Sequence, residues 1–292
     1  MATVPVSLRA TGAVARRQLI SRASRWVLLA LSLIGVAILA YLVYDTVEKG
    51  VTRLSWDFLT SYPSRFAERA GIRSAIFGTG WILTVTVLIA FPIAIGTAIW
   101  IEEFAPRNRL LTLVKLNLAN LAGVPSIIYG ILGLAIFVRY LDLGPSVLAG
   151  ALTLALMIIP MTVIASEEAI KQVPKSIRDG SLALGATQWQ TVRHHVLPQA
   201  LPGMMTGVIL GVSRAAGEAA TLIMIGALAF VAHEPDGLTD SFTIVPIQIY
   251  AWTIDPRQAF RENAAAAIIV LMVGVLSLNL IAAIIRERFR RD

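Results

Sequence analysis

The sequence predicts an all-α, polytopic membrane protein with six transmembrane helices. Three observations indicate this fold class: an excess of apolar residues, long runs without charge, and basic residues concentrated in alternate loops. Hydrophobic residues make up 57% of the 292 residues and charged residues only 15%, whereas a soluble domain carries about 25% charged residues. A surface in contact with lipid accounts for the difference. The chain contains no cysteine, which excludes disulfide bonds, thiol catalysis and cysteine-based metal sites.

The charge-free runs locate the predicted helices. A transmembrane helix needs about 20 predominantly apolar residues, and five runs of 19 to 28 residues meet this requirement: 26–44, 74–101, 116–138, 143–166 and 263–285. A sixth stretch, 203–230, is apolar apart from Arg214 and Glu218. Because lipid offers the backbone no hydrogen-bond partner, each span is expected to be a helix.

The distribution of basic residues predicts the orientation. Six spans place both termini on one side, and the positive-inside rule assigns the cytoplasm to the side richer in Lys and Arg. That side holds 16 of the 25 basic residues, in the two terminal tails and in the loops after the second and fourth helices, while the opposite side holds 8 basic and 10 acidic residues. Both termini are therefore predicted to be cytoplasmic. The same distribution explains the net charge of +7 without a nucleic-acid partner.

Two parts are expected along the chain. Residues 1–73 comprise a cytoplasmic tail, the first transmembrane helix and an external segment, and residues 74–292 form a five-helix core. The external segment 45–73 carries aromatic residues among charges and is expected to fold against the outer face of the membrane. A second external segment, 232–262, is polar and contains the turn signal Asp236-Gly237.

The cytoplasmic segment 166–202 is too long for a simple turn. Pro174 interrupts the chain, and Ser176 followed by Asp179 forms a capping-box pattern that predicts a new helix. Gly185 then permits a sharp change of direction. Composition alone is compatible with an interfacial linker helix. The alternative is a helix that lays an apolar face into a groove on a cytoplasmic partner.

This segment resembles the EAA loop of ABC importer permeases. The family pattern is Glu-Ala-Ala, three residues, Gly, nine residues, then Ile-x-Leu-Pro; here residues 179–181 read DGS, and His195 replaces the isoleucine. The resemblance implies that the loop docks on an ATPase subunit and transmits its closure. It assigns this coupling role to Asp179, Gly180, Ser181, Leu184, Gly185, Ala186, Trp189, Leu197 and Pro198.

Other segments are similar to the PstA-type permeases of phosphate ABC importers. Residues 124–130 (VPSIIYG) resemble the Val-Pro-Ser-Ile-Val-Tyr-Gly signature of these permeases, and residues 213–218 (SRAAGE) resemble a second segment of them. The resemblance extends from about residue 52 to the C-terminus. It implies a type I-like ABC importer permease fold, with 74–292 as the permease core and 166–202 as its coupling loop.

Arg214 and Glu218 are the predicted substrate-path residues. Four positions apart in a helix, they share a face and can pair, which would offset part of the ~2.5–3.5 kcal/mol cost of an arginine at the centre of a span. One interpretation is an ion pair that stabilises the fold. The other is an arginine that contacts oxyanions, with Glu218 limiting how tightly phosphate is held, and the family resemblance favours it. Pro125 and Ser126 are predicted to lie close to the same path.

The predicted function is that of a multi-pass, inner (plasma) membrane permease for inorganic phosphate. The chain has no Gly-x-x-x-x-Gly-Lys-Ser/Thr motif, so we expect it to bind no cofactor and to rely on ATP hydrolysis by a separate chain. The resemblance implies a sister permease (PstC-like), two ATP-binding subunits (PstB-like) and an external phosphate-binding protein (PstS-like).

Three alternatives remain open from the sequence. A sulfate or molybdate permease would share the Arg-x-x-Gly-Glu pattern, although those families commonly continue with Phe-Gly where this chain has Ala219-Ala220. A membrane sensor or scaffold that does not transport is the second alternative. An ion-driven transporter is the least favoured, because the spans hold no chain of carboxylates or histidines.

Overall fold

The computed structural model describes residues 12–227 and 230–291 and divides into two units, residues 1–49 and 50–292. The secondary structure of the described residues is helical, with no β-strand, so the predicted all-α class is confirmed. The first unit contains nearly all of α1 (Ala13–Gly50). Residues 16–42 of this helix are all exposed. An apolar helix with no buried face suits a lipid environment.

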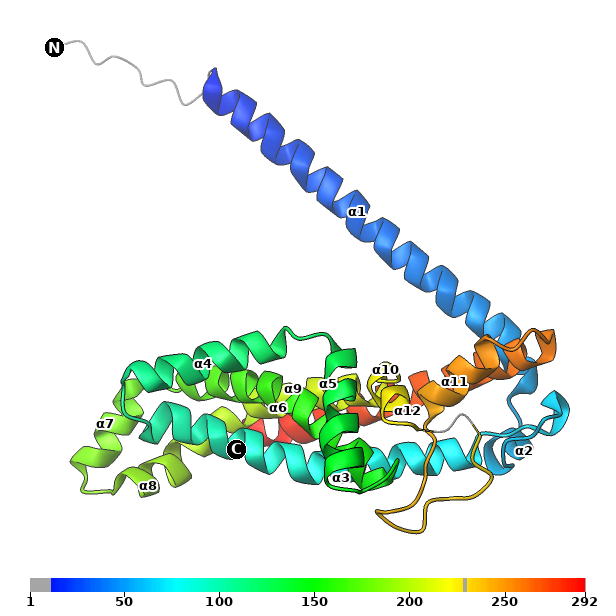
Figure 1. Ribbon diagram of the computed structural model, residues 1–292. Helices are drawn as coiled ribbons and strands as arrows, with labels where there is room; N and C mark the ends of the chain where they lie inside the picture. Colours follow the sequence, from blue (N-terminus) through cyan, green and yellow to red (C-terminus); the bar gives the residue numbers. More distant parts are fainter. Residues whose placement is uncertain (1–11, 228–229, 292) are drawn as a thin grey trace. The chain divides into compact units, whose positions relative to one another are not determined.

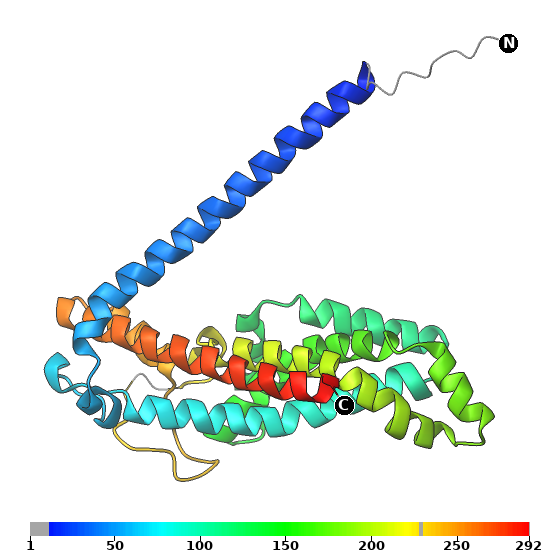
Figure 2. The same cartoon turned by 180° about the vertical axis from the view of Figure 1, so that it is seen from behind.

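In the second unit, long helices lie side by side around α6 (Val147–Lys171). The helices α3 (Arg73–Ile99) and α9 (Leu197–Ala216) pack on α6, and α12 (Gln258–Arg291) packs on α9 (Figures 1 and 2). Leu154, Ile158 and Ile170 of α6 are fully buried. A helix that is apolar all round takes the centre of such a bundle, where every face has a protein neighbour.

Close packing of α9 against α6 depends on small residues. Gly203, Gly207 and Gly211 recur every four residues and therefore line one face of α9. A Cβ atom added at Gly207 would lie 2.6 Å from the Cβ of Ala165 on α6, so the two backbones approach too closely for any side chain there. Small residues at such a contact maximise van der Waals packing between transmembrane helices.

The end of the unit that includes the N-terminal part of α12 contains a separate apolar cluster. Here α2 (Trp56–Thr60), the 3₁₀ turns Val51–Arg53 and Ala67–Arg69, and α11 (Val245–Thr253) gather around α12 and the start of α3. The ring of Trp252 lies 5.9 Å from that of Phe58 and 6.4 Å from that of Phe260, between ring centres. Residues 50–73 thus belong to the same compact unit as the five-helix core.

Four of the six predicted spans are single helices: α1, α3, α6 and α12. The third, predicted as a continuous helix over 116–138, is instead bent by 101°. It consists of α4 (Arg109–Ala122) and α5 (Ser126–Gly133), which continues as a π-helix over Leu134–Tyr140. Figure 1 shows α5 lying across the direction of α4. The break falls at Pro125, which lacks a backbone donor and disfavours helix in the residue before it. Within the described residues, six candidate spans result when the bent pair counts as one.

The fifth span also differs from the prediction of 203–230. It begins earlier, at α8 (Gln188–Thr191), passes through a π-helical turn (Val192–Val196) and α9, and ends at Ala216. After Gly217 the chain starts a separate short helix, α10 (Ala220–Met224). The apolar residues around Arg214 and Glu218 located this span, but apolar composition does not indicate where a helix ends. Backbone hydrogen bonding determines the end at Gly217.

Candidate functional site

The predicted cytoplasmic segment forms a hairpin of two short helices at one end of the second unit, α7 (Lys175–Ala183) and α8 (Figure 1). The predicted capping box at Ser176 and Asp179 does not form: α7 begins directly after Pro174, and no side chain caps it. Pro174 itself is the N-cap residue, so Ser176 already lies within the first turn.

A capping box forms instead at the start of α8. The hydroxyl of Thr187 accepts from the backbone N–H of Gln190 (3.3 Å), and the Gln190 side chain accepts from the N–H of Thr187 (2.8 Å). Between the two helices Gly185 has φ +85°, a left-handed conformation that favours glycine. The buried hydroxyls of Ser181 and Thr191 lie 3.0 Å apart and link the two arms. The predicted change of direction at Gly185 is therefore present.

The predicted coupling residues differ in exposure. Leu184 is 91% exposed and Trp189 53% exposed, although both are apolar. Ser181 is buried inside the hairpin and holds it together rather than facing outward. The remaining members are exposed or half-buried: Asp179, Gly180, Gly185, Ala186, Leu197 and Pro198. The exposed apolar tip around Leu184 and Trp189 fits a surface that a partner covers.

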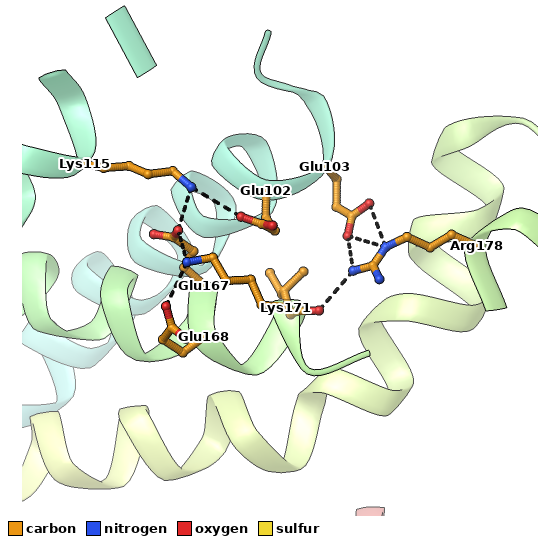
Figure 3. A network of polar contacts seen from close by, with 8 residues as sticks. Glu102, Glu103, Lys115, Glu167, Glu168, Lys171 and Arg178 are labelled. Atoms are coloured by element: carbon orange, nitrogen blue, oxygen red, sulfur yellow. Dashed lines mark hydrogen bonds and ion pairs between the residues drawn. The ribbon is translucent and has the colours of Figure 1, made fainter. Parts of the chain in front are cut away.

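A bidentate ion pair attaches this hairpin to the end of α3, where one π-helical turn (Trp100–Phe104) completes the helix. Nη2 of Arg178 donates to Oε1 of Glu103 (2.7 Å), and Nε lies 3.0 Å from Oε1 and 3.4 Å from Oε2 (Figure 3). The Arg178 and Glu103 side chains are only 19% and 8% exposed. Sequence reasoning placed both residues on the cytoplasmic side but did not predict the pair, because 75 residues separate them.

The neighbouring glutamate belongs to a different cluster. Glu102 pairs with Lys115 of α4 (3.4 Å), and Lys115 also pairs with Glu167 of α6 (2.7 Å). Lys171 then joins Glu167 and Glu168 within α6 (2.7 and 2.8 Å). This cluster ties together three helices of the bundle and includes no residue of α7 or α8 (Figure 3).

The second candidate region lies at the two helix breaks, where α5 contacts α10. The hydroxyl of Tyr129 donates to the carbonyl of Leu121, near the end of α4 (2.7 Å). The hydroxyl of Thr221 lies 3.0 Å from the carbonyl of Ser126, at the start of α5. Both hydroxyls are neutral, and each joins two helices at a break: Tyr129 links α5 to the end of α4, and Thr221 links α10 to the start of α5. Pro125 and Ser126 therefore form the break itself.

The structure contradicts the predicted pairing of Arg214 with Glu218. Because α9 ends at Ala216, the two residues are not four apart on one helix face. The Glu218 carboxylate turns to α10 and accepts from the backbone N–H of Thr221 (3.1 Å). Arg214 is exposed, lies 3.9 Å from the sulfur of Met161 through its Nη1, and makes no ion pair among the described residues.

A polar contact that was not predicted from the sequence joins α9 to α12 next to Arg214. The hydroxyl of Ser213 lies 2.6 Å from the Asn279 side-chain oxygen on α12 and 2.8 Å from the carbonyl of Ile209. Asn279 is a polar residue inside a long apolar run, which is the signal that could have identified it. The contact fixes the rotation of α9 and therefore the direction in which Arg214 projects.

Sequence comparison relates the chain to known membrane proteins. The family described as the inner membrane component of binding-protein-dependent transport systems matches residues 90–291. A probable ABC transporter permease, YqgI of Bacillus subtilis (strain 168), is 33% identical over 84% of this chain and 88% of its own. The phosphate transport system permease PstA 1 of Mycobacterium tuberculosis (strain CDC 1551 / Oshkosh) is 30% identical over 85% and 82%. These matches confirm the similarity to PstA-type permeases.

Two solved structures share the fold. A bacterial ABC transporter involved in the import of the acidic polysaccharide alginate has a chain that aligns with a TM-score of 0.66 at 17% identity, covering 93% of this chain and 99% of that one. The MetNI methionine ABC transporter aligns with a TM-score of 0.60 at 17% identity, covering 74% and 94%. At this identity the likeness concerns the fold alone, and it confirms the predicted ABC importer permease architecture.

Proposed function

We propose that this chain, which belongs to the family of inner membrane components of binding-protein-dependent transport systems, forms part of the path for inorganic phosphate in an ABC importer. Membership of this family makes the chain an ABC importer permease with several membrane-spanning helices. The substrate is the proposal. It is supported by the similarity to the phosphate transport system permeases PstA of several bacteria.

The observation that carries the proposal is the exposed guanidinium of Arg214. An arginine within a span is costly and calls for a reason, and no carboxylate pairs with it among the described residues. Its planar fork therefore remains available to an oxyanion, which it can bind through two parallel hydrogen bonds. Glu218 does not restrain Arg214 as predicted. Instead it organises the first turn after the helix break.

The proposed path runs beside the two helix breaks. Arg214 lies two residues before the α9 end, and the α10 segment after that end contacts the start of α5 at Ser126. Irregular backbone at membrane depth is tolerated where protein buries it or where it lines a cavity. Pro125 is exposed at the other break, which supports a position along the path for Pro125 and Ser126.

We assign ATP hydrolysis to partner chains, on which this chain docks. We place the α7–α8 hairpin, with its exposed Leu184 and Trp189, against one of two ATP-binding subunits. A PstC-like sister permease would complete the path, and an external phosphate-binding protein would deliver the anion. The chain itself is proposed to bind no cofactor.

Phosphate uptake tests the substrate assignment. The chain is reconstituted with its sister permease, ATP-binding subunits and binding protein, and ATP-driven uptake of radiolabelled phosphate is measured with sulfate or molybdate as competitor. We expect uptake that neither competitor reduces. Competition by sulfate or molybdate would reassign the substrate, and ATP hydrolysis without uptake of any of the three anions would favour a sensor or scaffold.

Cysteine labelling tests the proposed orientation. Both termini are expected in the cytoplasm because basic residues cluster on that side, and the natural chain has no cysteine to interfere. Single cysteines at positions 12 and 290 should resist a membrane-impermeant thiol reagent in intact cells, whereas one at position 237, in the predicted external segment, should react. Labelling at position 12 or 290 would reverse the assignment.

A further inference from the structure

Three contacts from the α7–α8 hairpin converge on two consecutive residues at the end of α3. Arg178 pairs with the Glu103 carboxylate, and the side-chain amide of Gln188 donates to the Glu103 carbonyl. The ring of Trp189 lies 6.3 Å from that of Phe104, between ring centres. Both arms of the hairpin therefore contact the same turn of the bundle.

Arg178 also reaches the end of α6. Its Nη2 donates to the carbonyl of Ile170 (3.0 Å), and its Nη1 donates to the carbonyl of Val173 (2.5 Å). Ile170 lies in the last turn of α6, and Val173 lies just beyond it, in the short connection to α7. A single guanidinium thus links α7 to two central helices of the bundle: to α3 through Glu103 (Figure 3) and to α6 through the carbonyl of Ile170.

From this geometry we infer that Glu103 and Arg178 are positioning residues that keep the hairpin rigidly attached to α3 and α6 throughout the transport cycle. A displacement of the hairpin is then passed to the helices of the path instead of being lost as a local tilt of α7. The inference rests on the proposed function, because it takes the hairpin to be displaced by an ATPase subunit. We name this contact the 103–178 clamp.

The chemistry of the pair suits a permanent joint. A bidentate arginine–carboxylate pair fixes orientation as well as distance, and both side chains are largely removed from water. Loss of one partner from such a pair leaves a charge with poor solvation, which is strongly unfavourable. Rigid attachment is therefore favoured over a latch that opens in every cycle.

Glu102 provides a matched control. It is adjacent in sequence to Glu103 and also pairs with a basic residue, but its partner Lys115 lies on α4 and retains Glu167 when Glu102 is neutralised. Replacement of either glutamate by glutamine removes one carboxylate from the same turn. Only the Glu103→Gln replacement removes the ion pair between α7 and α3, while the bonds of Arg178 to the carbonyls of Ile170 and Val173 remain.

The first test measures phosphate uptake per ATP hydrolysed by the full complex in proteoliposomes. We expect Glu103→Gln and Arg178→Gln to lower this ratio at least about fivefold while ATP hydrolysis continues, and Glu102→Gln to keep the wild-type ratio. Arg178→Lys keeps the charge but not the fork and should fall between. A purely structural role predicts lower abundance with an unchanged ratio, and that result for Glu103→Gln would overturn the inference.

The second test does not depend on the substrate. Hydrogen exchange of the backbone amides of residues 175–191 is measured in the same complexes. We expect exchange at least about tenfold faster in Glu103→Gln than in Glu102→Gln, since loss of one partner of a buried pair is worth several kcal/mol. Equal exchange would reject the clamp. Failure of the wild-type complex to take up phosphate would reject the substrate assignment alone.

The third test asks whether the clamp stays closed. Cysteines at 103 and 178 in this cysteine-free chain are joined by a bifunctional thiol reagent long enough to replace the ion pair. We expect the cross-linked complex to regain more of the uptake ratio than the same double variant treated with two single-ended reagents. A cross-link that abolishes uptake until it is reduced would show that α7 must detach, which contradicts the inference.

Discussion

The α7–α8 hairpin and the paired helix breaks at Pro125 and Gly217 are both interruptions of helical structure, but different chemistry holds them. Charged side chains attach the hairpin, through the 103–178 clamp. Hydroxyls and one local carboxylate hold the breaks: Tyr129 donates to the Leu121 carbonyl, Thr221 lies beside the Ser126 carbonyl, and Glu218 accepts from the N–H of Thr221.

The difference follows from the surroundings of each region. Beyond the ends of the spans, an ion pair lies in a medium where the desolvation cost of its charges is limited. Within the bilayer a charged group is expensive, while every backbone group freed by a break needs a partner. Hydroxyls link the helices at the breaks without adding charge, and the carboxylate of Glu218 bonds within its own turn. The exposed charge of Arg214 at the breaks is therefore not explained by a structural role.

Replacement of Arg214 is the most direct test of this difference between the two regions. We expect Arg214→Gln to reduce phosphate uptake roughly 10- to 100-fold, because a hydrogen bond to a charged group contributes about 1.5–3 kcal/mol. Arg214→Lys should retain partial uptake because it keeps the charge without the fork. Uptake is measured beside the abundance of the assembled complex, which should remain normal.

Glu218→Gln serves as the control for Arg214. Since the two residues do not pair in the structure, the double variant Arg214→Gln/Glu218→Gln should transport no better than Arg214→Gln. Recovery of uptake in the double variant would restore the ion-pair interpretation and exclude an essential anion contact.

The helix that connects the two regions, α9, should be sensitive at Gly207. We expect Gly207→Ala to destabilise the permease by about 1–3 kcal/mol, as overpacking of a close helix contact does, because the new Cβ would meet that of Ala165. Thermal unfolding of the purified complex measures the effect. The double variant Gly207→Ala/Ala165→Gly should recover most of it, and Gly274→Ala, where an added Cβ meets no atom within 4 Å, should be neutral.

Gly185 tests the hairpin itself. A side chain in its left-handed conformation costs roughly 1–2 kcal/mol, so Gly185→Leu should distort the hairpin, leave membrane insertion intact and uncouple ATP hydrolysis from uptake. Gly144 has φ +63° and equally open surroundings, but lies outside the hairpin. Gly144→Leu should therefore show similar strain with normal coupling. Normal transport by the Gly185 variant would remove the hairpin from the coupling route.

Tyr129 offers the smallest expected effect. Tyr129→Phe removes the hydroxyl that donates to Leu121 and should cost about 0.5–1.5 kcal/mol, the net contribution of an ordinary hydrogen bond. Thermal unfolding compared with Tyr140→Phe, at a position 84% exposed, measures it. An unchanged unfolding temperature for both variants would show that the hydroxyl adds nothing to the bond that the Leu121 carbonyl already accepts from the N–H of Val124 (3.0 Å).

The sequence by itself determined the class of the protein and most of its spans, because the absence of charge over about 20 residues is a direct consequence of the lipid solvent. It also located the α7–α8 hairpin, since Pro174 and Gly185 act on the local backbone. It did not locate the end of α9 or the angle of the bend at Pro125, which depend on contacts between helices such as those of Tyr129 with α4 and of Thr221 with α5.

Only the tertiary structure decided the partners of the charged residues. Spacing along one helix predicted that Arg214 would pair with Glu218, yet the helix ends between them, while Arg178 pairs with Glu103 from a distant part of the chain. A pair within a helix can be inferred from local geometry as long as the helix continues. A pair between helices depends on how α3, α6 and α7 pack against one another. The residues that meet in this packing are far apart in the sequence, so no regular spacing predicts the pair.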